Sequence, residues 1–314
     1  MACSGGRKDQ VYDREEPEQI YGDLIIFHAG SLSVPFKEMG EAFTLIHPEV
    51  NIMMESAGSV ASIRKITDLN KPCDILASAD YSLIDELLIP TYCDWNIHFA
   101  SNEMVIAYNE KSKYNEGINP DNWLNILLKE EVTYGRSDPD SDPCGYRTIL
   151  TMKLAGRFYN KPEFADLMMK KDRRYLRPKE VDLLALLETN TIDYIFIYRS
   201  VAEQHQLKYL VLPDEINLKN PLLKDMYSQA GVEIVGKTPE EKIRKQGEPM
   251  VYGITILNNA PNDNAAKAFL RFLLDPSLGR EIMQKNGQPS VIPDFTDSYH
   301  RLPEEFKMYA KNSR

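Results

Sequence analysis

Apolar residues occur along this chain in short runs, and each run is followed by a stretch in which apolar side chains recur at helical spacing. A short apolar run predicts a buried strand, and the spacing after it predicts an amphipathic helix. In the first part of the chain, the predicted strands and their helices are residues 23–27 with 32–46, 50–55 with 60–70, and 74–79 with 82–88. Strands that alternate with helices in this way are typical of a parallel, doubly wound sheet, so we expect an α/β fold.

The pattern changes at residues 101–109, which predict a long strand with no helix directly after it. We interpret this strand as a crossover into a second lobe. The elements expected there are helices at 121–128, 146–158, 179–189 and 199–206 and strands at 132–136 and 192–198. Residues 214–249 are rich in Lys and Glu with weak periodicity, which predicts an irregular excursion.

The last part of the chain is expected to return to the first lobe. Residues 250–256 predict a returning strand, and helices at 264–274 and 277–286 are expected to pack on the first lobe. The domain plan is a tether at 1–22, lobe I at 23–101, lobe II at 102–258 and a return to lobe I at 259–314. A chain that leaves one lobe, builds a second and returns has the topology of a hinged binding protein with its ligand in the cleft.

Two Gly-Ser loops follow the first two predicted strands, at Gly30-Ser31 and Gly58-Ser59. At a strand-to-helix junction such a pair presents backbone N–H groups and a hydroxyl at the positive end of a helix. This arrangement binds an oxyanion without a cationic side chain. Both loops lie beyond the carboxyl ends of parallel strands, where ligands of such sheets bind. Ser31 and Ser59 therefore predict one anion site, although each serine could equally be only a helix cap.

Composition and charge narrow the class of partner. The 314 residues are 43 % apolar and 27 % charged, as in ordinary soluble proteins, and no apolar run is long enough to span a membrane. A formal net charge of −10, with no stripe of Lys and Arg residues, argues against a nucleic-acid partner. An acidic protein that binds an anion must attract it locally, through helix dipoles and hydroxyl groups.

The segment Ala-Cys-Ser-Gly-Gly near the start of the chain is similar to the residues around the cleavage point of a bacterial lipoprotein signal. By this similarity Cys3 carries a lipid, the protein lies in the cell envelope or periplasm, and the charged residues 7–20 form a flexible tether. The alternative is an ordinary cysteine in a disordered terminus. Cys73, Cys93 and Cys144 have no metal-ligand spacing, and a Cys73–Cys93 disulfide stays an open question.

Residues 137–147 form the most unusual segment of the chain. Asp138, Asp140 and Asp142 alternate as in a calcium-binding loop, but the Gly and Glu that such a loop requires at its sixth and twelfth positions are absent. Pro143 instead predicts a rigid entry into a helix that presents backbone N–H groups. The alternative is a solvated acidic turn.

Three further residues could have a functional role, but each can also be explained by an ordinary structural one. Cys144 has no identifiable partner for nucleophilic catalysis. Glu180 lies in the first turn of a predicted helix, where the helix dipole favours an acidic residue. Tyr198 ends a predicted strand, where a tyrosine usually packs in the core, although its hydroxyl can face a cleft.

Together these segments resemble the periplasmic molybdate- and tungstate-binding proteins of ABC importers, in the branch best known from archaea. The resemblance covers roughly residues 23–295 and rests on long words in the same order, DPCGYR, RPKEVDLLALLE, YRSVAEQH and VYGITILNNAP. The chain departs from the archaeal pattern by a shorter stretch between Arg157 and Arg177.

The resemblance implies a two-lobed periplasmic-binding-protein fold of type II and the substrate-binding component of an ABC importer, with no catalytic activity and no cofactor. In that branch two loop serines and a tyrosine hold the oxyanion, and two carboxylates bond to its metal. The residues at matching positions are Ser31, Ser59, Tyr198, Asp142 and Glu180, with the backbone amide of Cys144 as a further donor. The implied partners are molybdate or tungstate and a membrane permease, and the protein is expected to be a monomer.

Two alternatives stay open. The same fold could hold another oxyanion such as sulfate, although Asp142 and Glu180 argue against it. A two-lobed α/β enzyme is the alternative from a different class, but the sequence contains no HExxH, GxSxG, Walker or GxGxxG motif.

Overall fold

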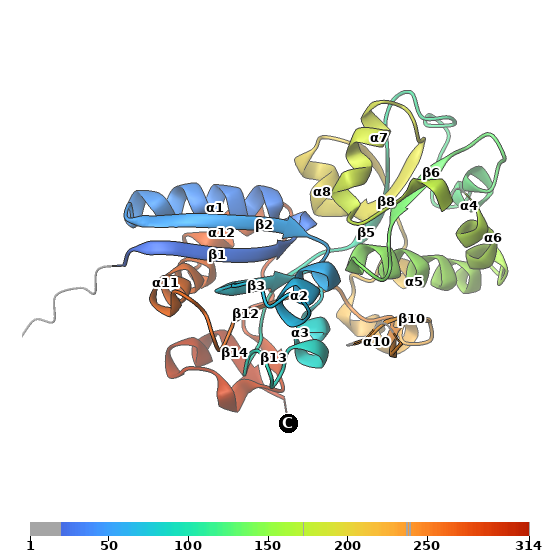
Figure 1. Cartoon of the computed structure of the whole chain (residues 1–314). Helices are drawn as coiled ribbons and strands as arrows, with labels where there is room; N and C mark the ends of the chain where they lie inside the picture. Colours follow the sequence, from blue (N-terminus) through green and yellow to red (C-terminus); the bar gives the residue numbers. More distant parts are fainter. Residues whose placement is uncertain (1–19, 172, 237, 239, 314) are drawn as a thin grey trace, which may run out of the picture.

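A computed structural model describes residues 20–171, 173–236, 238 and 240–313 of the chain. Two lobes lie side by side, and each contains a five-stranded sheet with helices packed against it (Figure 1). The expected lipid site at Cys3 lies outside the described residues, as does the expected tether up to residue 19.

Lobe I contains the first sheet. Its strands, in spatial order, are β2 Val50–Ala57, β1 Gly22–Ala29, β3 Ile75–Ser78, β12 Val251–Ile256 and β4 Ile97–Ser101. Strand β1 is parallel to β2 and β3, whereas β12 is antiparallel to β3 and β4. The helices of this lobe are α1 Ser33–Ile46, α2 Ser59–Thr67, α3 Tyr81–Leu87, α11 Asp263–Leu274 and α12 Gly279–Lys285. A small parallel pair, β13 Asp294–Thr296 and β14 Ala310–Asn312, follows near the C-terminus.

Lobe II contains the second sheet. Its strands, in spatial order, are β7 Leu176–Arg177, β6 Tyr134–Ser137, β8 Tyr194–Tyr198, β5 Met104–Tyr108 and β9 Lys208–Val211. Its helices are α4 Trp123–Leu127, α5 Pro143–Phe158, α6 Phe164–Lys170, α7 Leu184–Glu188, α8 Arg199–Gln204, α9 Asp214–Asn217 and α10 Lys224–Tyr227. Strand β6 is parallel to β7 and β8, and β5 is antiparallel to β8 and β9. The α/β prediction is therefore confirmed.

The chain crosses between the lobes where the sequence pattern changes. Strand β4 belongs to the first sheet and β5 to the second, so the crossover lies between Ser101 and Met104. The chain re-enters the first sheet at Val251, inside the range 102–258 that the sequence assigns to lobe II. Strand β12 has neighbours on both sides, so it is an interior strand of lobe I.

Residues 214–249 are more regular than the sequence predicts. They contain an antiparallel hairpin of β10 Gly231–Val235 and β11 Lys242–Gln246. The hairpin packs near α5, where Lys153 Nζ donates to the Gly231 carbonyl oxygen at 2.6 Å. The strand signal is weak because Lys245, a charged residue, occupies a buried position of β11.

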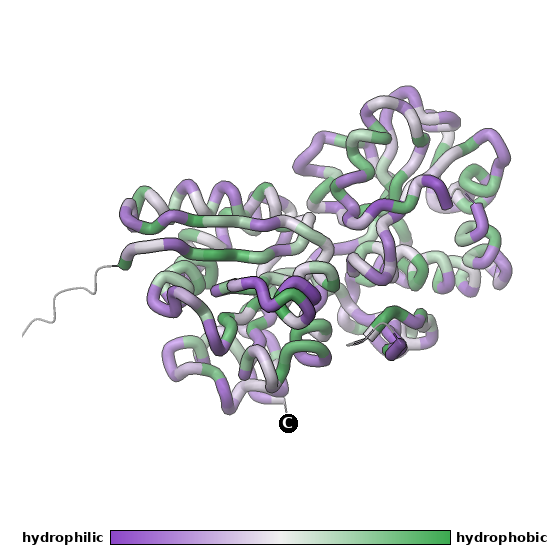
Figure 2. Tube along the Cα trace, viewed as in Figure 1, coloured by the Kyte–Doolittle hydropathy of each residue, from purple (hydrophilic) through white to green (hydrophobic). Residues whose placement is uncertain are grey.

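The interior of each lobe is apolar. Fully buried strand residues include Ile26 and Leu76 in lobe I and Ile106 and Phe196 in lobe II. Figure 2 shows hydrophobic residues along the strands and alternating hydrophobic and hydrophilic residues along α1. Two of the cysteines, at positions 73 and 93, are buried and free, so the disulfide left open above is not formed. No helix among the described residues combines the length and apolar character needed to cross a membrane.

Candidate functional site

All residues that the sequence and the resemblance point to are buried at the junction of the two lobes. The exposed fraction is at most 1 % for each of Ser31, Ser59, Asp142, Cys144, Glu180 and Tyr198. The two serines come from lobe I, after β1 and β2, and the other four come from lobe II. The structure therefore brings these residues from both lobes to one interface.

The loops of lobe I lie directly against lobe II. The N–H of Ala61 donates to the Ser141 carbonyl oxygen at 3.2 Å. A Cβ atom on Gly58 would lie 2.2 Å from the same oxygen, and one on Gly30 would lie 2.9 Å from Oε2 of Glu180. At position 58 only glycine allows this approach, because the opposing atom is a backbone oxygen, whereas at position 30 the opposing atom is the end of the Glu180 side chain, which can move.

The two serines do not act as helix caps. Ser59 is the first residue of α2, and its Oγ accepts a hydrogen bond from the N–H of Ala79 at 3.0 Å. Ser31 lies in the short 3₁₀ helix η1 Gly30–Leu32, with its Oγ 2.9 Å from the hydroxyl oxygen of Tyr252. No side chain caps the start of η1, α1 or α2. Because Ser59 already accepts a hydrogen bond, its own proton remains available to another acceptor.

Asp142 organises the carboxylate side of the site. Its Oδ1 accepts from the N–H of Cys144 at 3.3 Å and its Oδ2 from the N–H of Glu180 at 3.0 Å. Asp142 thus caps α5 and holds the start of the 3₁₀ helix η3 Glu180–Leu183 beside it. The Cys144 amide, expected to face the anion, donates to Asp142 in this structure.

Glu180 is buried without hydrogen-bond partners. No N–H or O–H group of the described residues donates to its carboxylate oxygens, although the side chain is only 1 % exposed. A proton on Glu180 could be shared only with the neighbouring Asp142 carboxylate. Burial raises the pKa of Glu180 well above its usual value, and the neighbouring Asp142 carboxylate raises it further. Burial also raises the pKa of Asp142. Two adjacent buried carboxyl groups are costly unless a proton or an electron-poor centre joins them.

The pair is not part of a larger cluster of metal ligands. Within the described part of the chain, no group of three or more His, Cys, Asp or Glu side chains is arranged to hold a metal ion. Two carboxylates surrounded by hydroxyl groups are better suited to a ligand that brings its own oxygen atoms.

Two residues that the sequence does not single out complete the lobe I side. Tyr252 in β12 is fully buried, and its hydroxyl accepts from Nδ2 of Asn102 at 2.9 Å. Asn102 lies at the crossover between the lobes, and its Nδ2 also donates to Oγ of Ser200 at 2.7 Å. Tyr252 lies within the word VYGITILNNAP, but no local pattern distinguishes it from an ordinary core tyrosine.

A buried cation also reaches the site. Arg147 in α5 is 2 % exposed, and its Nη1 donates to the Tyr198 hydroxyl at 3.1 Å and to the Ala79 carbonyl at 2.6 Å. Its Nη2 lies 3.9 Å from Oδ1 of Asp80. The sequence predicts that helix dipoles and hydroxyl groups alone attract the anion. The structure adds a guanidinium group, which donates a hydrogen bond to one of these hydroxyls.

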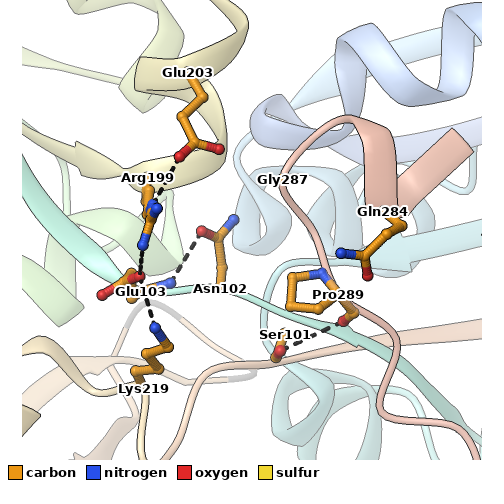
Figure 3. A pocket seen from close by; sticks show the side chains of 9 residues that line it. All are labelled: Ser101, Asn102, Glu103, Arg199, Glu203, Lys219, Gln284, Gly287 and Pro289. Carbon is orange, nitrogen blue, oxygen red and sulfur yellow. Dashed lines mark hydrogen bonds and ion pairs between the residues drawn. The ribbon is translucent and has the colours of Figure 1, made fainter. Parts of the chain in front are cut away.

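A separate cavity of about 300 Å³ lies at the hinge (Figure 3). On one wall, the Glu103 carboxylate contacts Arg199 at 2.9 Å and Lys219 at 3.2 Å, and Arg199 also contacts Glu203 at 2.8 Å. The facing wall is formed by Gln284, Gly287 and Pro289. The charged side chains that line this cavity form ion pairs with one another, in contrast to the carboxylate of Glu180.

Residues 24–288 match the family of bacterial extracellular solute-binding proteins. The chain belongs to this family. It is 47 % identical over 299 residues to a solute-binding protein of Petrotoga mobilis, covering 94 % of this chain and 92 % of that protein.

A second relative, the molybdate/tungstate-binding protein WtpA of Pyrococcus abyssi, is 44 % identical over 336 residues, covering 98 % of this chain and 93 % of that protein. The solved periplasmic molybdate-binding protein of Azotobacter vinelandii matches with a TM-score of 0.59 at 14 % identity, covering 86 % of this chain and 99 % of that one. This likeness shows the fold alone. The predicted two-lobed binding-protein fold is confirmed, and the chain is a solute-binding protein of the cell envelope.

Proposed function

We propose that this solute-binding protein holds molybdate or tungstate between its closed lobes and delivers it to an ABC transporter permease in the membrane. The observation that carries the proposal is the Glu180 carboxylate, buried beside Asp142 with both oxygens unpartnered. The WtpA relative is named for these two anions. In this proposal the protein is a monomer without catalytic activity or resident cofactor, and a lipid on Cys3 keeps it at the membrane.

Two carboxylates beside a dianion require an explanation, because like charges repel. At about 4 Å and an effective dielectric constant of 20, each pair of unit charges costs roughly 4 kcal/mol. A direct bond from a carboxylate oxygen to the central atom offsets this cost. Hexavalent molybdenum and tungsten are hard centres that accept further oxygen ligands, whereas the sulfur of sulfate cannot expand its shell in this way.

The hydroxyl groups supply the complementary interaction with the oxo atoms. The Ser59 hydroxyl accepts a hydrogen bond from the Ala79 N–H, and the Tyr198 hydroxyl accepts one from Arg147. Because both oxygens already accept, both hydroxyl protons remain free to point to the anion. Tyr252 accepts from Asn102 and can therefore donate to Ser31, which leaves the Ser31 proton for the anion as well. Asp142 and Glu180 disfavour sulfate and phosphate, which gain only the hydroxyl contacts and keep the repulsion.

Calorimetry and thermal unfolding of the purified protein test this proposal. We expect tungstate and molybdate to bind, and sulfate to bind far more weakly. Tungstate at 100 times its dissociation constant should stabilise the folded state by about 2.7 kcal/mol. A melting temperature that neither tungstate nor molybdate changes would contradict the assignment, and equal binding of sulfate would contradict the role of the carboxylates.

A further inference from the structure

Arg147 contacts both lobes at the site. The residue itself and Tyr198 belong to lobe II, whereas Ala79 and Asp80 follow β3 in lobe I. Its bond to the Ala79 carbonyl and its approach to Asp80 therefore form only while the lobes are together. Its contact with Tyr198 lies within lobe II and does not depend on closure.

The contact with Tyr198 decides where the phenol proton goes. A guanidinium group is always charged and can only donate hydrogen bonds. Since Nη1 donates to the Tyr198 oxygen, the hydroxyl proton of Tyr198 must point elsewhere. Nη2 of Arg147 has no hydrogen-bond partner among the described residues, so the guanidinium keeps donor capacity next to the site.

Ala79 connects this cation to the serine of the opposite lobe. Its N–H donates to Oγ of Ser59, and its carbonyl accepts from Arg147. The backbone of Ala79 is therefore hydrogen-bonded to two groups of the site. One is the Ser59 hydroxyl, which is expected to hold the anion, and the other is Arg147, which orients the Tyr198 hydroxyl. Moving the lobes apart breaks the Arg147 contact with Ala79.

We propose that Arg147 is a positioning residue for anion binding: in the closed protein it directs the Tyr198 proton to the ligand and, through Ala79, joins Tyr198 to the Ser59 side. Binding of the anion and closure of the lobes then support each other. The inference rests on the proposed function, because it requires an anion at Tyr198.

A double-mutant cycle on tungstate affinity tests the inference, with Arg147→Met, Tyr198→Phe and the double variant. Loss of one charge-assisted hydrogen bond weakens binding by roughly ten- to a hundredfold, so each single variant should fall in this range. If Arg147 acts through Tyr198, the double variant should lose much less than the product of the two single losses. Losses that simply multiply would overturn the inference.

Two further variants separate this role from a structural one. Arg147→Lys keeps a buried cation but lacks the planar fork that reaches Tyr198 and Ala79 together, so its loss should also shrink in the Tyr198→Phe background. It serves as the probe where Arg147→Met does not fold. Arg157→Met is the matched control, since Arg157 lies on the same helix and donates to Gln229 at 3.1 Å. It should leave tungstate affinity unchanged.

The wild-type titration keeps the two failures distinguishable. A wild-type protein that binds neither tungstate nor molybdate shows that the proposed function is wrong, and the inference falls with it. A wild-type protein that binds tungstate while both cycles are multiplicative shows that only the inference is wrong.

Discussion

Two acidic residues are equally buried where the lobes meet, but their surroundings are opposite. Asp80 is 2 % exposed and accepts from the N–H and hydroxyl of Ser82, with Lys245 at 3.8 Å and Arg147 at 3.9 Å. Glu180 is 1 % exposed, and its oxygens have no hydrogen-bond partner in the described structure. Burial tends to raise both pKa values, but the two cations lower that of Asp80 to about 2, while that of Glu180 stays well above its usual value.

This difference separates a structural carboxylate from one that awaits a ligand. The charge of Asp80 is compensated within the protein, and the Tyr146 hydroxyl donates to it as well. A charge on Glu180 is not compensated within the protein, so its ionisation in the folded state carries an electrostatic cost until a suitable partner arrives. Burial alone therefore does not identify a binding residue; what distinguishes Glu180 from Asp80 is a buried acidic group that no cation or hydrogen-bond donor of the described residues compensates.

Neutralising the two acids should change the stability of the ligand-free protein to different degrees. We expect Asp80→Asn to lower the free energy of unfolding by about 3 kcal/mol, since it leaves Arg147 without its counter-ion. Lys245 keeps Glu86 at 3.1 Å, which limits the loss. Glu180→Gln should cause no loss, because it removes an uncompensated charge. Urea denaturation of both variants checks this comparison.

The control for these two variants is Glu188→Gln, which changes an exposed glutamate of α7. It should have almost no effect on unfolding. Equal destabilisation by Asp80→Asn and Glu180→Gln would remove the distinction between the two buried acids.

For binding of tungstate, in contrast to stability without ligand, Glu180→Gln should cause a clear loss. Glu180→Gln keeps the shape of the side chain but makes it a poorer ligand, so tungstate binding should weaken by roughly 2 kcal/mol or more. Sulfate, now less repelled, should bind as well as before or better. Calorimetry with both anions measures the split. If the variant weakens both anions equally, Glu180 only supports the site structurally.

The sequence predicts the parts of this site that depend on local order. The apolar runs place β1 and β2, and therefore the loops with Ser31 and Ser59, because a strand followed by Gly-Ser is a local pattern. The contacts of Arg147 with Ala79 and Asp80 join distant segments and depend on how the lobes close, which no local pattern encodes. The roles of Asp142 and Glu180 came from the resemblance, since each alone also suits a helix start.

Removing a hydroxyl should affect all anions alike, in contrast to removing a carboxylate. Ser59→Ala should weaken tungstate, molybdate and sulfate by roughly 1–2 kcal/mol each, because each loses one hydrogen bond to a charged ligand. The same calorimetric series measures this effect. A loss confined to tungstate would mean that Ser59, and not only Glu180, discriminates between anions.

The smallest expected effect is the pH dependence of stability, which has opposite sign at the two acids. The pKa of Asp80 falls from 3.8 to about 2 on folding, so its contribution is complete above pH 3.8 and is lost as the pH falls toward 2. Glu180 has a folded pKa above 4.5, so the folded state binds more protons and becomes less stable as the pH rises above that value.

Denaturation of the ligand-free protein at about pH 5 and pH 7 measures the Glu180 contribution. The wild-type protein should lose more stability between these values than Glu180→Gln, in which this group does not titrate. Parallel losses in the two proteins would show that Glu180 is not the group responsible.

The central claim is that a buried carboxylate bonds to the metal of the bound anion. X-ray absorption at the tungsten edge, recorded on the tungstate complex in solution, tests it most directly. The account predicts oxygen atoms in the first shell beyond the four of free tungstate, and loss of at least one of them in Glu180→Gln. A tetrahedral four-oxygen shell in the wild-type complex, unchanged in the variant, would contradict it.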